Sequence, residues 1–198
     1  MNIQKNSLEQ SCHLEGNKVL HVNEQIRFVC VREEHFGKVK DFILKECKSH
    51  YGTRIFAQRY EELEAKITHE IKDKNNAFYA CFNQKNEVVG SISICQYDNR
   101  IASLQEYYKQ GNVAEVGRCY VLDSYRRRGI GSSLFDLAKH FASQRGYEVL
   151  YLHTHYFLPG GFSFWQNMGF EITLDEGGDW QTVHMERLVR EIQYSFAV

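Results

Sequence analysis

A glycine-containing turn beside three consecutive arginines is the part of the sequence best suited to binding an anionic ligand. Residues 121–134 read Val-Leu-Asp-Ser-Tyr-Arg-Arg-Arg-Gly-Ile-Gly-Ser-Ser-Leu, after a β-rich run and before an apolar helical stripe. Glycines at positions 129 and 131 allow a tight turn and a close approach of the backbone to a ligand. The free amides at the start of a helix attract negative charge. With the arginine charges nearby, the turn suits a pyrophosphate.

Three other interpretations of this turn compete. A dinucleotide-binding Rossmann turn needs a third glycine at the position that Leu134 occupies. A P-loop needs a Gly-Lys-Ser/Thr sequence after a longer spacer, and the turn lacks it. A purely structural turn with solvated arginines is compatible with the local sequence, so the turn alone does not decide the function.

Composition narrows the remaining function classes. The 198 residues carry 24 Lys and Arg against 25 Asp and Glu, a formal net charge of −1, which gives no electrostatic case for a nucleic acid or a membrane surface as partner. No apolar run approaches the roughly 18 residues of a membrane helix, and the amino terminus lacks a signal-peptide pattern. The six cysteines have neither disulfide-scaffold nor zinc-site spacing. We therefore expect a cytoplasmic protein with reduced thiols.

Hydrophobic periodicity predicts the elements that position the turn. Helical stripes indicate helices around residues 36–47, 60–71, 134–142 and 162–168, and a short one within 97–111. Alternating or continuous apolar runs indicate strands over 26–32, 77–82, 88–95, 115–122, 149–154, 170–174 and 180–188. This order of elements is typical of a mixed α/β sheet domain.

The length favours a single domain. Residues 25–190 contain all of the predicted elements and are expected to form that domain. Residues 1–24 are polar and mixed, and we interpret them as an extension, either mobile or folded against the domain. Residues 191–198 are interpreted as a carboxyl-terminal tail.

The motif Arg126-x-x-Gly129-x-Gly131, after the strand 115–121, resembles the cofactor signature of the GCN5-related N-acetyltransferase (GNAT) family. The resemblance extends over about residues 26–188 in element order. It implies an α/β (α+β) fold: a mixed, mostly antiparallel sheet of about six to seven strands, helices on both faces, and a fourth and fifth strand that run parallel and splay apart. Coenzyme A enters that gap in the family.

The resemblance also implies a cosubstrate, acetyl-CoA, and the residues that hold it. Backbone groups near Val121 would pair with the pantetheine arm, and the amides of the turn would hold the pyrophosphate. The residues assigned to acetyl-CoA are Val121, Leu122, Arg126, Arg127, Arg128, Gly129, Ile130, Gly131, Ser132, Ser133 and Trp165.

Acyl transfer to an amine requires that the amine lose a proton, that the oxyanion find a donor and that the thiolate leave. Glu115, six residues before Val121, stands where many members of the family carry the glutamate that deprotonates the amine. It can act as that base or as an anchor for an ammonium group. A surface glutamate at a strand end is the alternative without a function.

The family's usual general acid, a tyrosine in the helix after the fifth strand, is replaced by Trp165, and Leu158 stands where an asparagine is often found. An indole N–H donates a hydrogen bond but is no useful proton source at pH 7. Tyr156 and Ser163 are nearby candidates for the proton donor. We take Tyr156 as the second catalytic residue.

Two other sets of residues are weighed and set aside. His153 and His155 share one face of the fifth strand, but no third ligand of suitable spacing accompanies them, so contact with substrate or packing is favoured over a metal site. Cys119 shares a strand with Glu115, but no paired His or Asn signature accompanies it. We therefore expect direct transfer and no metal.

The predicted function is transfer of the acetyl group of acetyl-CoA to a primary amine of a small metabolite or amino-acid-like acceptor. A protein or peptide amine is the enzymatic alternative, and a non-catalytic acyl-CoA-binding sensor is the alternative from another class. The acceptor is expected to contact residues 50–59, 97–111 and 175–179. By analogy with the family, two copies can pair as a homodimer through sheet edges or the carboxyl-terminal strands.

Overall fold

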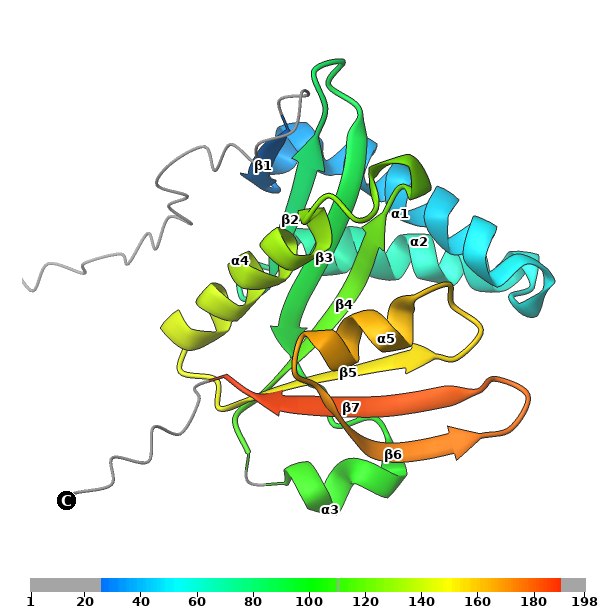
Figure 1. Ribbon diagram of the computed structural model, residues 1–198, viewed down its shortest axis with the longest axis vertical. Helices are drawn as coiled ribbons and strands as arrows, with labels where there is room; N and C mark the ends of the chain where they lie inside the picture. The colour runs from blue at the N-terminus through cyan, green and yellow to red at the C-terminus, as the bar shows by residue number, and fades with distance from the viewer. Residues whose placement is uncertain (1–25, 110, 190–198) are drawn as a thin grey trace, which may run out of the picture.

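The architecture is a seven-stranded mixed sheet between two layers of helices, seen in a computed structural model that describes residues 26–109 and 111–189 (Figure 1). The strands lie in the order β1-β2-β3-β4-β5-β7-β6, and every neighbouring pair is antiparallel except β4 and β5. The predicted sheet with a parallel fourth and fifth strand is thus confirmed. The strands are β1 (Arg27–Cys30), β2 (Ala77–Phe82), β3 (Val88–Gln96), β4 (Val113–Val121), β5 (Val149–His155), β6 (Glu171–Gly177) and β7 (Thr182–Leu188).

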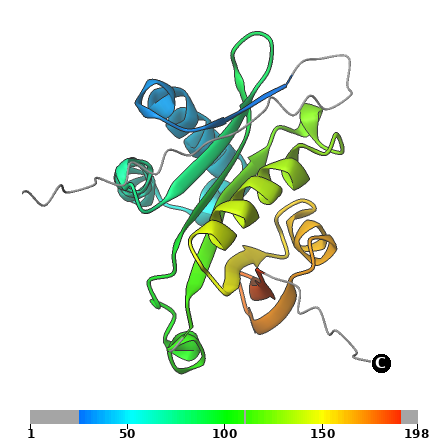
Figure 2. The same ribbon diagram turned by 90° about the vertical axis from the view of Figure 1, so that its left-hand side faces the viewer.

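The helices cover both faces of the sheet, as predicted, with α1 and α2 on one side and α4 and α5 on the other (Figure 2). Short 3-10 turns precede or follow several of them: η1 (Glu33–His35), η2 (Gly52–Arg54), η3 (Ala102–Leu104) and η4 (Asp123–Tyr125). The helices are α1 (Phe36–Tyr51), α2 (Ala57–Lys72), α3 (Gln105–Tyr108), α4 (Ile130–Gln144) and α5 (Gly161–Asn167).

The two-residue repeat of β2 explains why both faces of the sheet are apolar. Ala77, Tyr79 and Cys81 point into the cluster under α4, and the intervening side chains point into the cluster under α1 and α2. All six residues of the strand are buried, which is the pattern of a central strand with helices on both faces. The continuous apolar run of the sequence follows from this double burial.

Strands β4 and β5 are paired at one end only. Residues 113–115 of β4 are in parallel register with residues 149–151 of β5, and beyond that point β4 pairs only with β3 and β5 only with β7. In the same stretch, the β3–β4 register shifts between Ser91 and Ser93, and Arg118 adopts a φ of +50°. The irregularity bends β4 away from β5, so the two strands form a fork (Figure 1).

The closing hairpin differs from the sequence prediction in its bounds. The strand expected over 180–188 begins at Thr182, because Gln181 has a φ of +51° and Trp180 lies in the turn. The preceding strand reaches Gly177 rather than Leu174. Gly177 and Gly178 have positive φ, so the chain reverses direction at these glycines and not at the acidic residues 175 and 176 before them.

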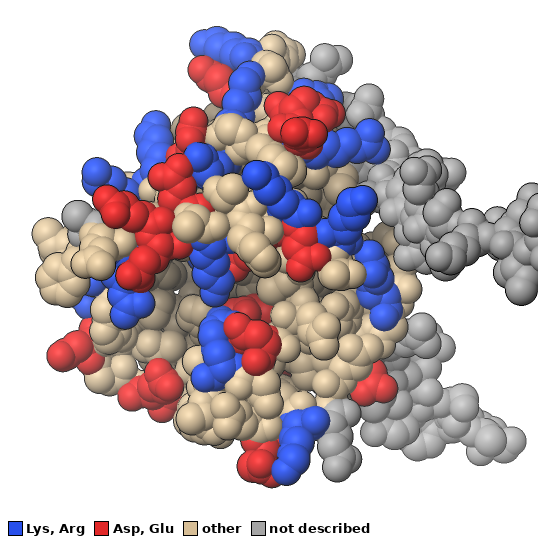
Figure 3. Space-filling view, turned by 180° about the vertical axis from the view of Figure 1, so that it is seen from behind, with Lys and Arg blue, Asp and Glu red and all other residues tan. Residues whose placement is uncertain are grey.

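The regions expected to be an extension (1–24) and a tail (191–198) lie outside the described residues. In the described part of the chain, no helix is both long and apolar enough to cross a bilayer. The face formed by α1 and α2 carries basic and acidic side chains in alternation, with no large area of one sign (Figure 3).

Gly90 of β3 provides a test of the packing under α4. A Cβ at this position would lie 2.9 Å from Sγ of Cys81 and 3.2 Å from side-chain carbons of Ile130 and Leu134. All three neighbours are buried and cannot move into solvent. We expect Gly90→Ala to lower the free energy of unfolding by about 1–3 kcal/mol, measured by urea unfolding.

The matched control is Gly37→Ala in α1. Gly37 is exposed, and no atom lies within 4 Å of a Cβ added there. Because alanine favours the helix, this variant should gain up to about 1 kcal/mol. Equal stability of the Gly90 variant and the parent protein would contradict the close packing of β3 against α4.

Candidate functional site

A cavity of about 370 Å³ lies in the fork between β4 and β5. One wall is formed by residues 116–120 of β4, and the other by residues 152–154 of β5. Trp165 of α5 lines it from one helical layer, and Tyr51 of α1 lines it from the other. The cavity exists because the strands stop pairing after residues 115 and 151, which leaves their facing edges apart.

Glu115 is the last paired residue of β4 at this fork, and its carboxylate is held by Arg100. Nη1 of Arg100 donates to Oε2 at 2.6 Å and Nη2 donates to Oε1 at 2.5 Å, the two-point geometry that suits guanidinium and carboxylate. Nδ1 of His153 lies 3.5 Å from the same Oε1. Asp98 accepts a further hydrogen bond of 2.8 Å from Arg100.

The environment of Glu115 fixes its charge. Burial raises the pKa of this carboxyl, but hydrogen bonds and positive charge from Arg100, together with His153, outweigh burial and lower the pKa to about 2. The side chain of Glu115 is only 12% exposed. Glu115 is therefore a paired carboxylate at neutral pH, with little tendency to accept a proton.

A second carboxylate of the cavity is also paired. Glu70 of α2 lies 3.3 Å from Nη2 of Arg118 and 3.6 Å from Nζ of Lys66. Arg118 reaches Glu70 from the irregular part of β4, where its φ of +50° is uncommon for a residue with a side chain. All three residues line the cavity, so its α2 side carries two cations and one carboxylate.

The predicted anion-binding turn leads directly into α4. Gly129 is the N-cap of this 15-residue helix, with a φ of +77°, and Arg127 before it has a φ of +60°. The amides of residues 130–132 belong to the first turn of the helix and have no partner within it, since Ser133 makes the first bond, to the carbonyl of Gly129. These free amides and the helix dipole fit an anion.

The three arginines of the turn are not equivalent. Nε of Arg126 donates to the carbonyl of Val121 at 3.1 Å, and Nη2 lies 3.0 Å from Nε2 of His50 in α1. Arg126 thus braces the turn against α1. Arg127 and Arg128 are exposed, and the guanidinium of Arg128 lies 5.1 Å from the ring centre of Tyr125.

The residues predicted to supply the proton lie at different places. Trp165 and Leu158, which replace the expected tyrosine and asparagine, both line the cavity. Tyr156 does not line it, and its hydroxyl donates to Oδ2 of Asp175 on β6 at 2.8 Å. Ser163 is exposed on α5 and also lies outside the cavity lining. The structure brings Glu115 and Trp165 to the cavity, and not Tyr156.

Two buried histidines near the cavity, His155 of β5 and His184 of β7, have different hydrogen-bond partners. His155 is buried, and its Nδ1 donates to the carbonyl of Trp180 at 2.8 Å. His184 of β7 is buried with Nδ1 2.8 Å from the Tyr151 hydroxyl. Within residues 26–109 and 111–189, no group of three His, Cys, Asp or Glu side chains is placed to hold a metal ion.

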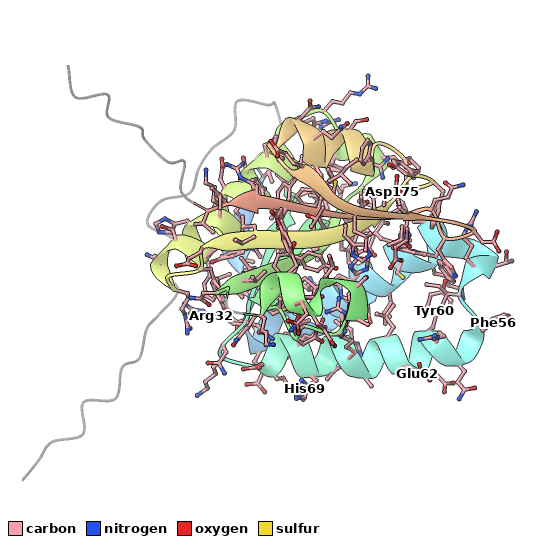
Figure 4. The ribbon with its side chains drawn as sticks, turned by 90° about the horizontal axis from the view of Figure 1, so that it is seen from below. Arg32, Phe56, Tyr60, Glu62, His69 and Asp175 are labelled. Atoms are coloured by element: carbon pink, nitrogen blue, oxygen red, sulfur yellow. The ribbon has the colours of Figure 1, made fainter. Side chains whose placement is uncertain are left out.

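A contact between two turns lies close to Tyr51, one of the residues that line the cavity. Nη1 of Arg54, in η2, donates to the carbonyl of Asp179 at 2.8 Å, and its guanidinium lies 4.3 Å from the ring centre of Phe157. The Tyr51 ring packs edge-on against Phe157 at 5.6 Å. At this end of the molecule, Phe56 and Tyr60 mark the start of α2 (Figure 4).

Several residues of the site escaped the sequence prediction. Arg100 lies in a region expected to contact the acceptor, but nothing in its local sequence signals a pairing with Glu115, 15 residues later. Glu70 carried no signal beyond helical periodicity. Arg118 lies within the strand expected over residues 115–122, and only the positive φ seen in the structure distinguishes it from a surface residue of a strand.

Comparison with known proteins identifies the family to which this fold and this cavity belong. The sequence profile of the acetyltransferase (GNAT) family matches residues 43–170, which is more than half of the chain. The chain therefore belongs to the acetyltransferase (GNAT) family. The predicted family and its cosubstrate, acetyl-CoA, are confirmed.

Solved structures agree on the fold. The chain is similar to an acetyltransferase of the GNAT family from Staphylococcus aureus, with 19% identity, a TM-score of 0.66, and coverage of 83% of this chain and 99% of that one. It is also similar to the PaiA N-acetyltransferase from Thermoplasma acidophilum in complex with coenzyme A (20% identity, TM-score 0.61, 83% and 99% covered). An aminoglycoside 6′-acetyltransferase type Ii matches with 18% identity and a TM-score of 0.58 (83% and 97% covered). No curated protein sequence matches the chain.

Proposed function

We propose that this protein is an N-acetyltransferase that moves the acetyl group of acetyl-CoA directly to a primary amine of a small metabolite or amino-acid-like acceptor. The observation that carries the proposal is the cavity at the fork of β4 and β5, which has paired charged groups in its walls. At the end of the fork, β4 leads through the arginine-containing turn into the amino terminus of α4. When bound, acetyl-CoA supplies the acetyl group as an activated thioester.

The residues that would hold acetyl-CoA are those of the turn and the fork. The free amides of residues 130–132 and the exposed charges of Arg127 and Arg128 suit a pyrophosphate. The edge of β4 that faces β5 leaves its backbone without a neighbouring strand after residue 115. Backbone groups on that edge can pair with an extended, amide-containing arm. Trp165 lines the same space.

The dimensions of the site support a small acceptor over a protein. The cavity of about 370 Å³ is at the low end of small-molecule pockets, and it would also hold the end of the acetyl-CoA arm, so little space is left for an acceptor. The contact of Arg54 with Asp179 joins the α1–α2 turn to the β6–β7 turn, which narrows the approach from the acceptor side. Paired charges such as Glu70 with Arg118 also suit a polar, compact molecule.

Direct transfer is favoured because the cysteines of the cavity are poor nucleophiles. Burial raises the pKa of Cys119 to about 12. Burial, together with the charge of Glu115, raises the pKa of Cys95 to about 12. Both thiols are protonated at neutral pH, and the thiolate is the form that would attack a thioester.

The role of Tyr156 as proton donor stays a prediction. Its hydroxyl is hydrogen-bonded to Asp175 and would first have to break this bond.

A non-catalytic acyl-CoA-binding sensor is the second candidate. Trp165 and Leu158, in place of a tyrosine and an asparagine, both line the cavity, which favours binding over proton transfer at that wall. A panel of amines separates the two candidates. Thiol release from acetyl-CoA measures the reaction rate with each amine, and mass spectrometry identifies the product.

We expect thiol release with at least one small primary amine and formation of its acetamide. Amino acids, polyamines, aminoglycosides and lysine-containing peptides form the arms of the panel, and matched alcohols serve as controls. Tight binding of acetyl-CoA without turnover on any amine would support the sensor. Turnover confined to peptides would support the protein-directed alternative.

A further inference from the structure

The arrangement of charged groups at the fork assigns the proton of the amine to a residue other than Glu115. We infer that His153 accepts this proton through Nε2, with Glu115 and Arg100 as positioning residues that hold the imidazole. The inference rests on the proposed N-acetyltransfer and adds to it the identity of the base.

His153 occupies the point where the two strands separate. Tyr151 is the last residue of β5 in register with β4, opposite Glu115. Two residues further along, His153 is the next residue on the same face of β5, and it lines the cavity. Its side chain is 40% exposed, whereas that of Glu115 is 12% exposed. Of the two side chains, His153 is the more accessible to a molecule in the cavity.

Glu115 is unsuited to the role of base because of its partner. Both of its oxygens accept hydrogen bonds from Arg100, at 2.5 and 2.6 Å. A carboxylate held in this way has a pKa of about 2, so it gains little by accepting a proton from an ammonium group. Its remaining close polar neighbour is Nδ1 of His153, at 3.5 Å.

The contact with Glu115 orients the imidazole. A carboxylate beside Nδ1 favours the tautomer with the proton on Nδ1, which leaves the lone pair on Nε2. The ion pair of His153 with Glu115 is made through Nδ1 and not through Nε2. The same order of groups, a carboxylate that orients a histidine which then takes a proton, is a recurrent arrangement for general bases. Here Arg100 in turn holds the carboxylate of Glu115 in place through two hydrogen bonds.

The other titratable groups around His153 do not compete for the role. His155, with a ring centre 6.0 Å away on β5, is buried and bonded to the carbonyl of Trp180. His184 of β7, at 6.2 Å, is buried and lies next to the Tyr151 hydroxyl. Burial lowers the pKa of both.

Three more groups complete the surroundings of His153. Nε2 of His184 lies 3.3 Å from Glu176 of β6, without hydrogen-bond geometry. Arg100 faces the cluster from the segment after β3, with its charge paired to Glu115 and Asp98. Tyr151, between the histidines and α3, is buried, and burial raises its pKa. His153 is the most exposed of the three histidines.

The step balances without a further reactant. The amine nitrogen forms a bond to the acetyl carbon, the carbon–sulfur bond breaks, and its electron pair stays on sulfur. An ammonium acceptor loses two protons in all: one leaves to solvent when the neutral amine forms, and one leaves the nitrogen as the amide forms. His153 accepts a proton from the acceptor nitrogen through Nε2. The imidazolium then returns this proton to the thiolate or to solvent, which restores the neutral histidine.

The test compares His153→Gln and His153→Asn with Glu115→Gln, on the amine that the panel identifies. We expect kcat at neutral pH to fall by about 100-fold or more in both His153 variants, the range for loss of a general base. The deficit should shrink toward pH 9.5, where more of the amine is already deprotonated. Glu115→Gln should lose less than either His153 variant.

Chemical rescue and two controls separate chemistry from structure. Imidazole added to His153→Ala should restore part of the rate, which a structural role would not allow. His140→Gln, an exposed histidine on α4, should stay within about twofold of the parent protein. Acetyl-CoA affinity by calorimetry and the unfolding midpoint show whether each variant is folded. With three substitutions at position 153, a folding defect in one variant does not decide the result.

The outcomes distinguish this inference from the proposed function. His153 variants that keep the parent rate and the parent pH profile would overturn His153 as the base and leave amine acetylation intact. A larger loss in Glu115→Gln than in His153→Gln, without rescue by imidazole, would return the role to Glu115. Absence of turnover on every amine by the parent protein would overturn the proposed function, and the base with it.

Discussion

Gly129→Val is expected to weaken the binding of acetyl-CoA by at least about 100-fold, a loss of about 2.7 kcal/mol of binding free energy. Gly129 is the N-cap of α4 and has a φ of +77°. A β-branched residue is an outlier in this left-handed region, so valine forces the turn to another conformation. The free amides of residues 130–132 would then no longer converge on one anion. Isothermal titration with acetyl-CoA measures the loss.

Gly146→Val is the matched control for this prediction. Gly146 follows the other end of the same helix, has a φ of +74°, and has no atom within 4 Å of an added Cβ. Both variants should lose about 1–2 kcal/mol of stability from the same backbone strain. Only Gly129→Val should lose affinity for acetyl-CoA. Equal affinity in the two variants would contradict the assignment of the turn to the cosubstrate.

The turn and the fold could be predicted because their signals are local. The glycines at 129 and 131 and the charges at 126–128 lie within one short segment, between a strand and a helix that periodicity alone indicates. The order of elements then restricts the sheet, and the family signature supplies the parallel pair. The run of six apolar residues over 77–82 predicted a strand, and the structure shows that this strand, β2, is buried on both faces.

The polar contacts of the cavity could not be predicted, because they join distant segments. Arg100 and Glu115 come together only when the segment after β3 folds back over β4. The sequence placed Tyr156 near the fifth strand, but the reversal of the chain after His155 turns its hydroxyl toward Asp175 on β6. The sequence favoured contact with substrate or packing for His153 and His155 alike, and only the fork shows why the positions of the two differ.

The role of Arg100 can be measured through stability as well as turnover. Arg100→Leu leaves the carboxylate of Glu115 buried without its partner, and breaking a buried pair on one side costs about 3 kcal/mol or more. The double variant Arg100→Leu/Glu115→Leu should recover part of this loss, because it removes the unpaired charge as well. Turnover should fall in both, since neither holds the imidazole of His153.

The difference in stability between the parent protein and Arg100→Leu should depend on pH, and this dependence shows how Arg100 stabilises the fold. In the folded parent protein the pKa of Glu115 is about 2, below its ordinary value of 4.5, so the carboxylate contributes about 3 kcal/mol of stability that is present above pH 4.5 and is lost as the pH falls toward 2. In Arg100→Leu this contribution is absent, and burial then raises the pKa of Glu115. The stability of the two proteins, from urea unfolding, should therefore differ most near pH 6.5 and converge in acid. A difference that stays constant between pH 6.5 and pH 3 would mean that Arg100 stabilises the fold by packing and not by holding the charge of Glu115.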